Sequence, residues 1–219
     1  MKKLKWNKPL AAIIVGITCF FFTAGCSFFG IRTSEEASYH VLAKYDRIEI
    51  REYGELVAVE TDVQASYDEA GRIAFKKLFG YISGENGSQL KIAMTAPVMS
   101  SEAFAVDGEK IAMTSPVIGE KQGSGWRFSF VLPTSYTLEN APVPSNPEVK
   151  LAVIPRKKVA VIRYSGPWKE RAMREKSEEL IEWIRSNGIK RLSEPRSAGY
   201  DPPWTLPFLR RNEIMIDVK

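Results

Sequence analysis

The sequence predicts an α+β fold made of two pseudo-symmetric halves, each with the order strand, strand, helix, strand. Three observations support this prediction. Several short segments alternate apolar and polar residues, which is typical of strands with one buried face. Two longer segments, 66–82 and 167–187, repeat apolar residues every three to four positions, which is typical of amphipathic helices. Because each helical segment lies between strand segments, we expect sheet layers with the helices packed against them.

The first 25 residues are typical of a lipoprotein signal peptide. Its basic start contains Lys2, Lys3, Lys5 and Lys8. The apolar run from Leu10 to Phe22 is shorter than the roughly 20 residues that a bilayer-spanning helix needs. Small residues then precede Cys26, as in the lipobox of bacterial lipoproteins, although Thr23 stands where the lipobox usually has leucine. We expect cleavage before Cys26 and a lipid anchor of diacylglycerol and palmitate on it; a plain signal peptide or a membrane anchor is the alternative.

A lipid anchor would hold the chain at the cell envelope. Residues 26–43 would then be a tether, and residues 44–219 would form one folded domain, which we expect to be a monomer. Ser27 follows Cys26 where aspartate would signal retention, so the outer membrane, facing the periplasm, is the expected location in an organism with two membranes.

The charge of the chain argues against nucleic acid as a partner. The chain has 31 lysine and arginine residues, 26 aspartate and glutamate residues and a net charge of +5. The signal peptide holds four of the lysines and no acidic residue, which leaves a net charge of +1 after cleavage. The domain has no dense basic tract that could follow a phosphate backbone.

Cysteine usage and missing motifs argue against an enzyme. The two cysteines, Cys19 and Cys26, lie in the signal peptide and at its cleavage site. The domain therefore has no thiol for a disulfide, a nucleophile or a metal site. It also has no phosphate loop, no Gly-x-Ser-x-Gly motif and no metal-ligand spacing, so we expect a binding protein without enzymatic activity.

Three carboxylates leave one catalytic arrangement open. Glu49 and Glu52 lie close together in the first predicted strand, and Glu213 opens the last one. Solvated charges at strand edges, or ion pairs to Arg210 and Arg211, are the simpler interpretation.

The first half of the domain contains two strand segments and a helix. Arg47–Tyr53 and Leu56–Val63 alternate apolar and polar residues and predict a hairpin. Ser66–Ile82 has helical periodicity, and Ser66 with Glu69 has the spacing of a capping box.

A repeated segment follows the first helix. Lys91–Val98 returns, almost unchanged, as Lys110–Val117, and both copies alternate apolar and polar residues. Asp107–Gly108 between them is a strong turn pair. We expect a pair of strands that packs its apolar face, including Met94 and Met113, against the core; chance duplication of a good strand is the alternative.

The second half repeats the order of the first. Thr134–Pro147 is rich in proline and is expected to link the halves. A helix is expected to open at Pro167 and to end before Gly188. Strands are predicted at Trp126–Leu132, Val149–Ile154, Val159–Tyr164 and Glu213–Val218.

One edge of the first helix combines aromatic and basic residues. At 100° per residue, four residues lie together beside the apolar stripe: Arg72, Phe75, Lys76 and Phe79. This edge could hold a flat apolar ligand with acidic groups. Core aromatics flanked by basic residues that reach solvent are the alternative.

A stiff aromatic loop precedes the last strand. It contains three rings and three prolines: Tyr200, Trp204, Phe208, Pro202, Pro203 and Pro207. A rigid aromatic loop of this kind is either a wall of a binding site or a lid over the core.

Several separated motifs together resemble the SOUL haem-binding protein family. They are Ile48–Tyr53, Phe75–Gly84, Lys91–Val98, Phe130–Pro133, Tyr200–Pro203 and Arg210–Glu213. The resemblance covers roughly residues 40–219. It implies a distorted β-barrel with two helices, made of two similar halves and similar to the effector-binding domains of some bacterial regulators. It also implies that haem or another tetrapyrrole binds in a hydrophobic cleft beside the first helix and the late Tyr-Pro-Pro loop.

The resemblance assigns residues to this cleft by position. They are Arg72, Phe75 and Phe79 of the helix and Tyr200, Pro202, Trp204 and Phe208 of the loop. Arg72 would pair with a haem propionate, because a guanidinium suits a carboxylate, and Lys76 is a second candidate. Some members carry a basic residue within the loop, where this chain has Thr205–Pro207.

His40 is the one histidine and the candidate axial ligand of a haem iron. The alternative is an ordinary surface histidine near the tether. Without an axial ligand, haem would be held by its ring faces and edges. A binding module for another flat hydrophobic ligand, or for a protein partner, is the alternative function.

Overall fold

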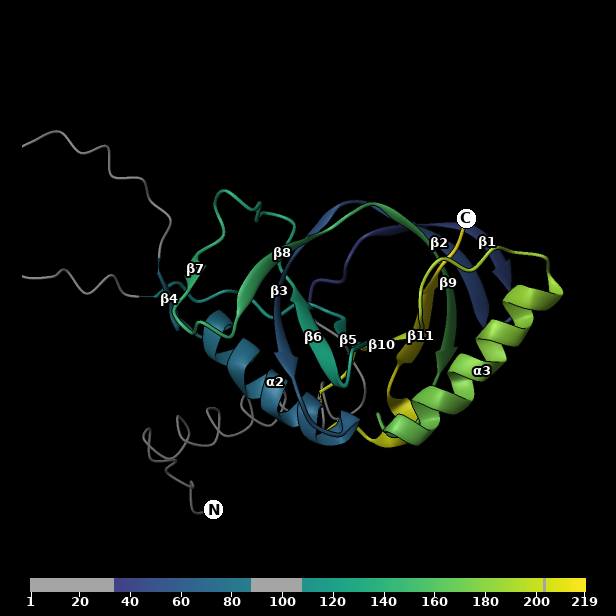
Figure 1. Cartoon of the computed structure of the whole chain (residues 1–219). Coiled ribbons are helices and arrows are strands. Elements are labelled where there is room, and N and C mark those ends of the chain that lie inside the picture. The colour runs from purple at the N-terminus through teal and green to yellow at the C-terminus, as the bar shows by residue number, and fades with distance from the viewer. Residues whose placement is uncertain (1–33, 88–107, 203) are drawn as a thin grey trace, which may run out of the picture.

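The computed structural model describes residues 34–87, 108–202 and 204–219. Strands form a curled sheet, and two helices, α2 (Tyr67–Ile82) and α3 (Glu170–Ser186), pack against one face of it (Figure 1). The predicted α+β class with two main helices is confirmed. In these described ranges, no helix combines the length and the apolar character needed to cross a membrane.

The main sheet has nine strands in the order β1-β2-β9-β11-β10-β5-β6-β3-β8. The strands are β1 (Tyr39–Tyr45), β2 (Ile48–Tyr53), β3 (Leu56–Val63), β5 (Val117–Gln122), β6 (Gly125–Val131), β8 (Lys150–Ile154), β9 (Lys157–Tyr164), β10 (Arg196–Gly199) and β11 (Asn212–Asp217). Every neighbouring pair is antiparallel. A short separate pair joins β4 (Asn86–Gly87) to β7 (Val143–Pro144).

The two halves of the chain exchange strands. β2 of the first half pairs with β9 of the second, and β8 of the second half pairs with β3 of the first. The predicted hairpin between Arg47–Tyr53 and Leu56–Val63 is therefore wrong. Alternation predicts that a segment is a strand, but it does not choose the strand's partner.

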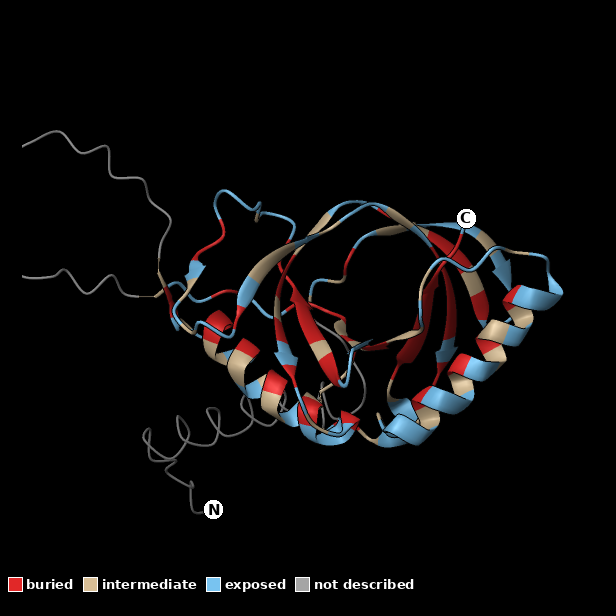
Figure 2. Ribbon diagram, viewed as in Figure 1, coloured by how far each residue is buried: buried red, intermediate tan, exposed pale blue. Residues whose placement is uncertain are grey.

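The main core lies between the sheet and the helices. Ala70, Ala74 and Leu78 of α2 and Leu180 of α3 have no exposed surface. Figure 2 shows the buried parts of both helices on the side that faces the sheet. α2 packs on β3 and β6, whereas α3 packs on β9 and β11. We call this side of the sheet the helix face and the opposite side the open face. The predicted capping box does not form at α2, because the Ser66 side chain makes no capping hydrogen bond.

The described chain enters the fold earlier than the expected tether would allow. The Ala37 amide donates to the Ser115 carbonyl at 2.9 Å, and the Ser115 amide donates to the Glu35 carbonyl at 2.8 Å. β1 then pairs with β2 along its length, with His40 opposite Glu52. Residues 34–43 thus belong to the folded part, although we expected them in the tether.

The second copy of the repeat is not the strand that we predicted. β5 starts only at Val117. Before it, individual hydrogen bonds rather than a strand ladder connect the chain to the rest of the fold. The Ile111 amide donates to the Ile82 carbonyl at 2.8 Å, and the Thr114 hydroxyl donates to the Val131 carbonyl. Met113, expected in the core, is 36% exposed. The first copy, Lys91–Val98, lies outside the described residues.

Candidate functional site

The outward side of α2 presents the aromatic edge that the helical spacing predicted. The rings of Phe75 and Phe79 stack with centroids 5.8 Å apart and planes 11° apart. Phe75 also meets Phe130 of β6 at 5.4 Å and 65°, which ties the pair to the sheet. Phe79 remains 47% exposed. The helix therefore carries a flat apolar surface that is anchored at one end and open at the other.

Two basic side chains accompany this surface. Arg72 and Lys76 are exposed and lie on the same helix as Phe75 and Phe79. Within the described ranges, neither makes a hydrogen bond or an ion pair with a protein group. Both are thus available to a carboxylate on a ligand that covers the aromatic pair.

The aromatic loop divides its three rings between two surroundings. Trp204 and Phe208 are 61% and 69% exposed, and Pro202 is half-buried. Tyr200, by contrast, is 4% exposed and donates its hydroxyl to Glu213 at 2.8 Å. Two of the three predicted ring contacts are therefore open to a ligand, whereas Tyr200 is buried among polar groups.

Trp168 lies between the base of this loop and the start of α2. Its ring meets Tyr67 in the first turn of α2 at 5.9 Å and Phe128 of β6 at 6.0 Å. A side chain at Gly199, just before the loop, would come within 3.2 Å of the Trp168 ring. The indole Nε1 is buried without a hydrogen-bond partner in the described chain. We did not single out Trp168 from the sequence; its place beside Gly166 and Pro167, at a helix start, was the available signal.

The structure does not bring His40 to α2. His40 is exposed on β1, at one end of the strand order, whereas α2 packs on β3 and β6 near the other end. In the ranges described, no group of three or more histidine, cysteine, aspartate or glutamate side chains is placed to hold a metal ion. A ligand on α2 would therefore be held by its ring and acidic groups, without help from His40.

A buried charge cluster lies on the open face. Arg51 donates to both oxygens of Glu213, Nη1 to Oε2 at 2.8 Å and Nη2 to Oε1 at 3.0 Å. Arg211 Nε donates to Glu213 Oε1 at 2.9 Å, and the Arg211 guanidinium also covers the Tyr200 ring at 3.8 Å. Glu213 has no exposed surface. The expected ion pair with Arg211 is present, but the expectation of a solvated Glu213 is wrong, because the curled sheet encloses it.

The cluster fixes the ionisation of its members. Burial alone would raise the pKa of Glu213, but the hydrogen bond and charge of Arg51 and the charge of Arg211 outweigh burial and lower it. Burial, with the nearby Glu213 carboxylate, raises the pKa of Tyr200 well above its usual value. Glu213 therefore stays charged and Tyr200 stays neutral, which suits a structural network in which every partner is satisfied.

Comparison with known proteins gives consistent matches. The profile described as SOUL heme-binding protein matches residues 34–217. "Heme-binding protein 1" of Sus scrofa is 28% identical over 184 residues, which cover 81% of this chain and 89% of that protein. "Heme-binding protein 2" of Mus musculus is 47% identical over 53 residues, which cover 24% of this chain and 26% of that protein.

Two solved structures share the fold. The C-terminal domain of EcmrR aligns with a TM-score of 0.54 at 14% identity and covers 83% of this chain and 98% of that domain. A structure titled as a hydrolase from Listeria innocua aligns with a TM-score of 0.51 at 15% identity, covering 81% of this chain and 94% of that one. At these identities the likeness concerns the fold alone.

Proposed function

Because the chain belongs to the SOUL haem-binding protein family, we propose that it binds haem or a related tetrapyrrole on the outward side of α2, for carriage, buffering or sensing. The observation that carries the proposal is the stacked pair Phe75 and Phe79 beside the two available cations Arg72 and Lys76. A tetrapyrrole such as haem combines a flat apolar ring with carboxylates, so it matches this surface in both respects.

Each residue has a distinct part in this proposal. Phe79 supplies the exposed ring on which the ligand lies, and Phe75 holds Phe79 in place by stacking between it and Phe130. Arg72 and Lys76 bind the acidic groups at the ligand's rim. Trp204 and Phe208 are further exposed rings, but they lie on the loop before β11 and no ring contact in the described chain joins them to Phe75 or Phe79. Bound iron would supply redox and ligand-binding chemistry, but the protein groups here recognise the ring.

The first test is a haemin titration of the full chain, purified in detergent, with the detergent blank subtracted and the Soret band recorded. We expect saturable binding that weakens at least tenfold in Arg72→Glu and in Phe79→Ala. Arg174→Glu, an exposed arginine on α3, is the matched control and should leave the affinity unchanged. A titration no different from that of an unrelated protein would overturn the proposal.

Two further variants separate ring recognition from iron ligation. His40→Ala should leave the Soret spectrum unchanged, since His40 lies far from α2 in the sheet order. Iron-free protoporphyrin should bind about as well as haemin. A changed spectrum in His40→Ala would instead identify an axial ligand and move the haem site away from α2.

We also propose that the protein is an envelope lipoprotein anchored through Cys26. The support is the basic, apolar and small-residue pattern of residues 1–26, which lie outside the described ranges. Cells fed labelled palmitate should label the wild-type chain and not Cys26→Ser, and membrane fractionation should place it in the outer membrane of a host with two membranes. Labelling that persists in Cys26→Ser would contradict the anchor.

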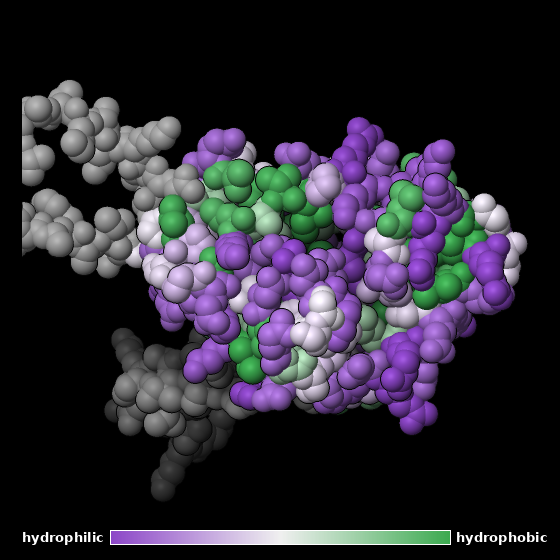
Figure 3. Space-filling model, in the orientation of Figure 1, coloured by the Kyte–Doolittle hydropathy of each residue, from purple (hydrophilic) through white to green (hydrophobic). Residues whose placement is uncertain are grey.

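The second candidate function is a module for a protein partner. Apolar side chains are exposed at both ends of the strand order: Val41 and Leu42 on β1 are 49% and 51% exposed, and Val153 on β8 is 40% exposed. Figure 3 shows separate apolar areas in the left and right halves of the molecule, the sides on which β8 and β1 lie in Figure 1. Edge strands with exposed apolar residues are common places for pairing with another chain. A failed haemin titration would make this function the better account.

A further inference from the structure

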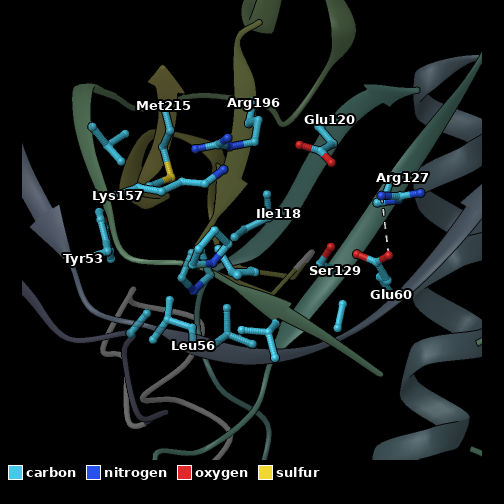
Figure 4. Close-up of a pocket in the computed structure, with 18 residues that line it drawn as sticks. Tyr53, Leu56, Glu60, Ile118, Glu120, Arg127, Ser129, Lys157, Arg196 and Met215 are labelled. Carbon is cyan, nitrogen blue, oxygen red and sulfur yellow. Dashed lines mark ion pairs between the residues drawn. The ribbon is translucent and has the colours of Figure 1, made fainter. Parts of the chain in front are cut away.

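A cavity of about 190 Å³ lies on the open face (Figure 4), and none of its lining residues belongs to α2 or α3. Much of its lining is apolar and includes Leu56, Ile118, Val131, Val159 and Met215. An apolar cavity of about 150 Å³ can hold benzene, whereas pockets for drug-sized ligands begin at roughly 300 Å³. The cavity therefore suits a small ligand with one ring-sized apolar body, and it is too small for a tetrapyrrole.

One side of the cavity carries more positive than negative charge. Lys157 Nζ lies 2.8 Å from Asp217 Oδ2, and Arg196 Nη1 donates to the same oxygen at 3.1 Å. Arg196 Nη2 donates to the other oxygen of Asp217. Lys157 and Arg196 both line the cavity. Two cations thus share the carboxylate of Asp217. The next acidic residue, Glu120, lies opposite Arg196 in the register without an ion pair to it in the described chain.

The other side carries more negative than positive charge. Arg127 Nε lies 2.8 Å from Asp62 Oδ1, and Arg127 Nη1 lies 3.5 Å from Glu60 Oε1. Glu120 also lines the cavity, but its side chain has no hydrogen bond or ion pair with the described part of the chain. Two carboxylates therefore share one guanidinium, and the carboxylate of Glu120 has no ion pair of its own in the described chain. Exposed Lys150, opposite Glu60 in the register, offsets part of this charge from the solvent side.

The charged side chains on the two sides of the cavity do not pair with one another across the sheet. In the register, Glu120 lies between Arg127 of β6 and Arg196 of β10. This order would allow Glu120 to form ion pairs with both arginines across the three strands. The terminal nitrogens of Arg196 nevertheless bind Asp217, and Arg127 Nε binds Asp62. Burial raises the pKa of Glu60, although Arg127 opposes the rise, which indicates a carboxylate short of solvation. Figure 4 shows Lys157 and Arg196 toward one side and Glu60 and Arg127 toward the other.

We propose that this cavity binds a small zwitterion with a ring-sized apolar body, its ammonium toward Glu120 and Glu60 and its carboxylate toward Lys157 and Arg196. The apolar wall between the two sides would hold the body. The cavity lies on the opposite face of the sheet from α2. This proposal therefore does not depend on whether a tetrapyrrole binds at α2.

Three probes with one aromatic body test the proposal: 4-(aminomethyl)benzoate, benzylammonium and benzoate. Calorimetric titration of the full chain in detergent should show 4-(aminomethyl)benzoate binding about tenfold more tightly than either singly charged probe, because a charged hydrogen bond at each end contributes that much. Benzylammonium bound as tightly as the zwitterion, or no binding by any probe, overturns the proposal.

Two variants assign the ends of the ligand. Glu120→Gln should lower the affinity for the zwitterion and for benzylammonium about tenfold and leave the affinity for benzoate unchanged. Lys157→Met should instead lower the affinity for the zwitterion and for benzoate. Glu178→Gln, an exposed glutamate on α3, is the matched control. Haemin binding should be the same in all three variants. Zwitterion binding that survives Glu120→Gln unchanged overturns the assignment.

Discussion

The two faces of one sheet are built from the same strands but stabilised by different forces. On the helix face, β11 presents Ile214 and Ile216 to a core shared with α2 and α3. On the open face, the same strand presents Glu213 and Asp217, each held by arginine. All six residues of β11 are buried. Burial is therefore not a mark of apolar character here, because the curl of the sheet encloses charges that a flat sheet would expose.

The difference teaches that each face should respond to a different kind of change. Packing on the helix face is non-directional, and its cost follows the volume removed. The open-face cluster depends on complete pairing, since a buried charge that loses its partner is costly. Four changes test this contrast, from the largest expected effect to the smallest.

The largest effect is expected from breaking the open-face cluster. Arg51→Leu removes the two-pronged partner of a carboxylate that has no exposed surface. We expect the free energy of unfolding to fall by about 3–5 kcal/mol in urea denaturation. Arg156→Leu, which breaks the exposed pair with Glu52, is the control and should be close to wild type. Equal small effects in both variants would show that the open face behaves as ordinary surface.

Removing packing from the helix face should cost somewhat less. Leu78→Ala empties a site with no exposed surface between α2 and the sheet, so we expect a loss of about 2–4 kcal/mol in the free energy of unfolding. Leu192→Ala, 56% exposed, should change little. If the Leu78 variant were as stable as wild type, the helix would not be fixed by this stripe.

The pH dependence should separate the two faces further. The pKa of Glu213 is lowered in the folded state, below its ordinary value of 4.5. Its contribution is thus complete above about pH 4.5 and is lost as the pH falls through the lower, folded-state pKa. Glu213→Gln should flatten this acid loss of stability, whereas Leu78→Ala should keep the slope of wild type. If the free energy of unfolding fell with pH in the same way in wild type and Glu213→Gln, the result would argue against a charged Glu213.

The smallest effect is expected at the rim of the open face. Glu120 makes no ion pair within the described chain, so Glu120→Gln should change the free energy of unfolding by less than about 0.5 kcal/mol. Thermal unfolding without ligand is the measurement. A clear loss of stability would mean that Glu120 belongs to a structural ladder of charges, and the contrast between cluster and rim would disappear.

The sequence predicted the helix face better than the open face. Ala70, Ala74, Leu78 and Ile82 recur at helical spacing, and all four are buried as this spacing requires. Single-strand alternation also located most strands. These signals are local, so a single sequence carries them.

The misses have a common physical cause, which is contact between distant segments. β2 and β3 are adjacent in sequence but pair with β9 and β8, and no local pattern encodes that choice. The simpler interpretation of Glu213 is a solvated charge or an ion pair to Arg210 or Arg211, because charged residues usually lie at the surface. Its burial also depends on Arg51, which lies far away in the chain. In the candidate site, the α2 edge followed from spacing, whereas the separation of His40 from α2 depends on the strand order.

The position of β11 has a consequence for how the molecule is made. β11 follows every other described strand in the chain, yet it joins β9 on one side to β10 on the other. A ribosome releases the chain from its N-terminal end, so β1-β2-β9 and β10-β5-β6-β3-β8 cannot become one sheet until β11 has emerged. The nine-stranded sheet therefore cannot be completed until β11 has been synthesised.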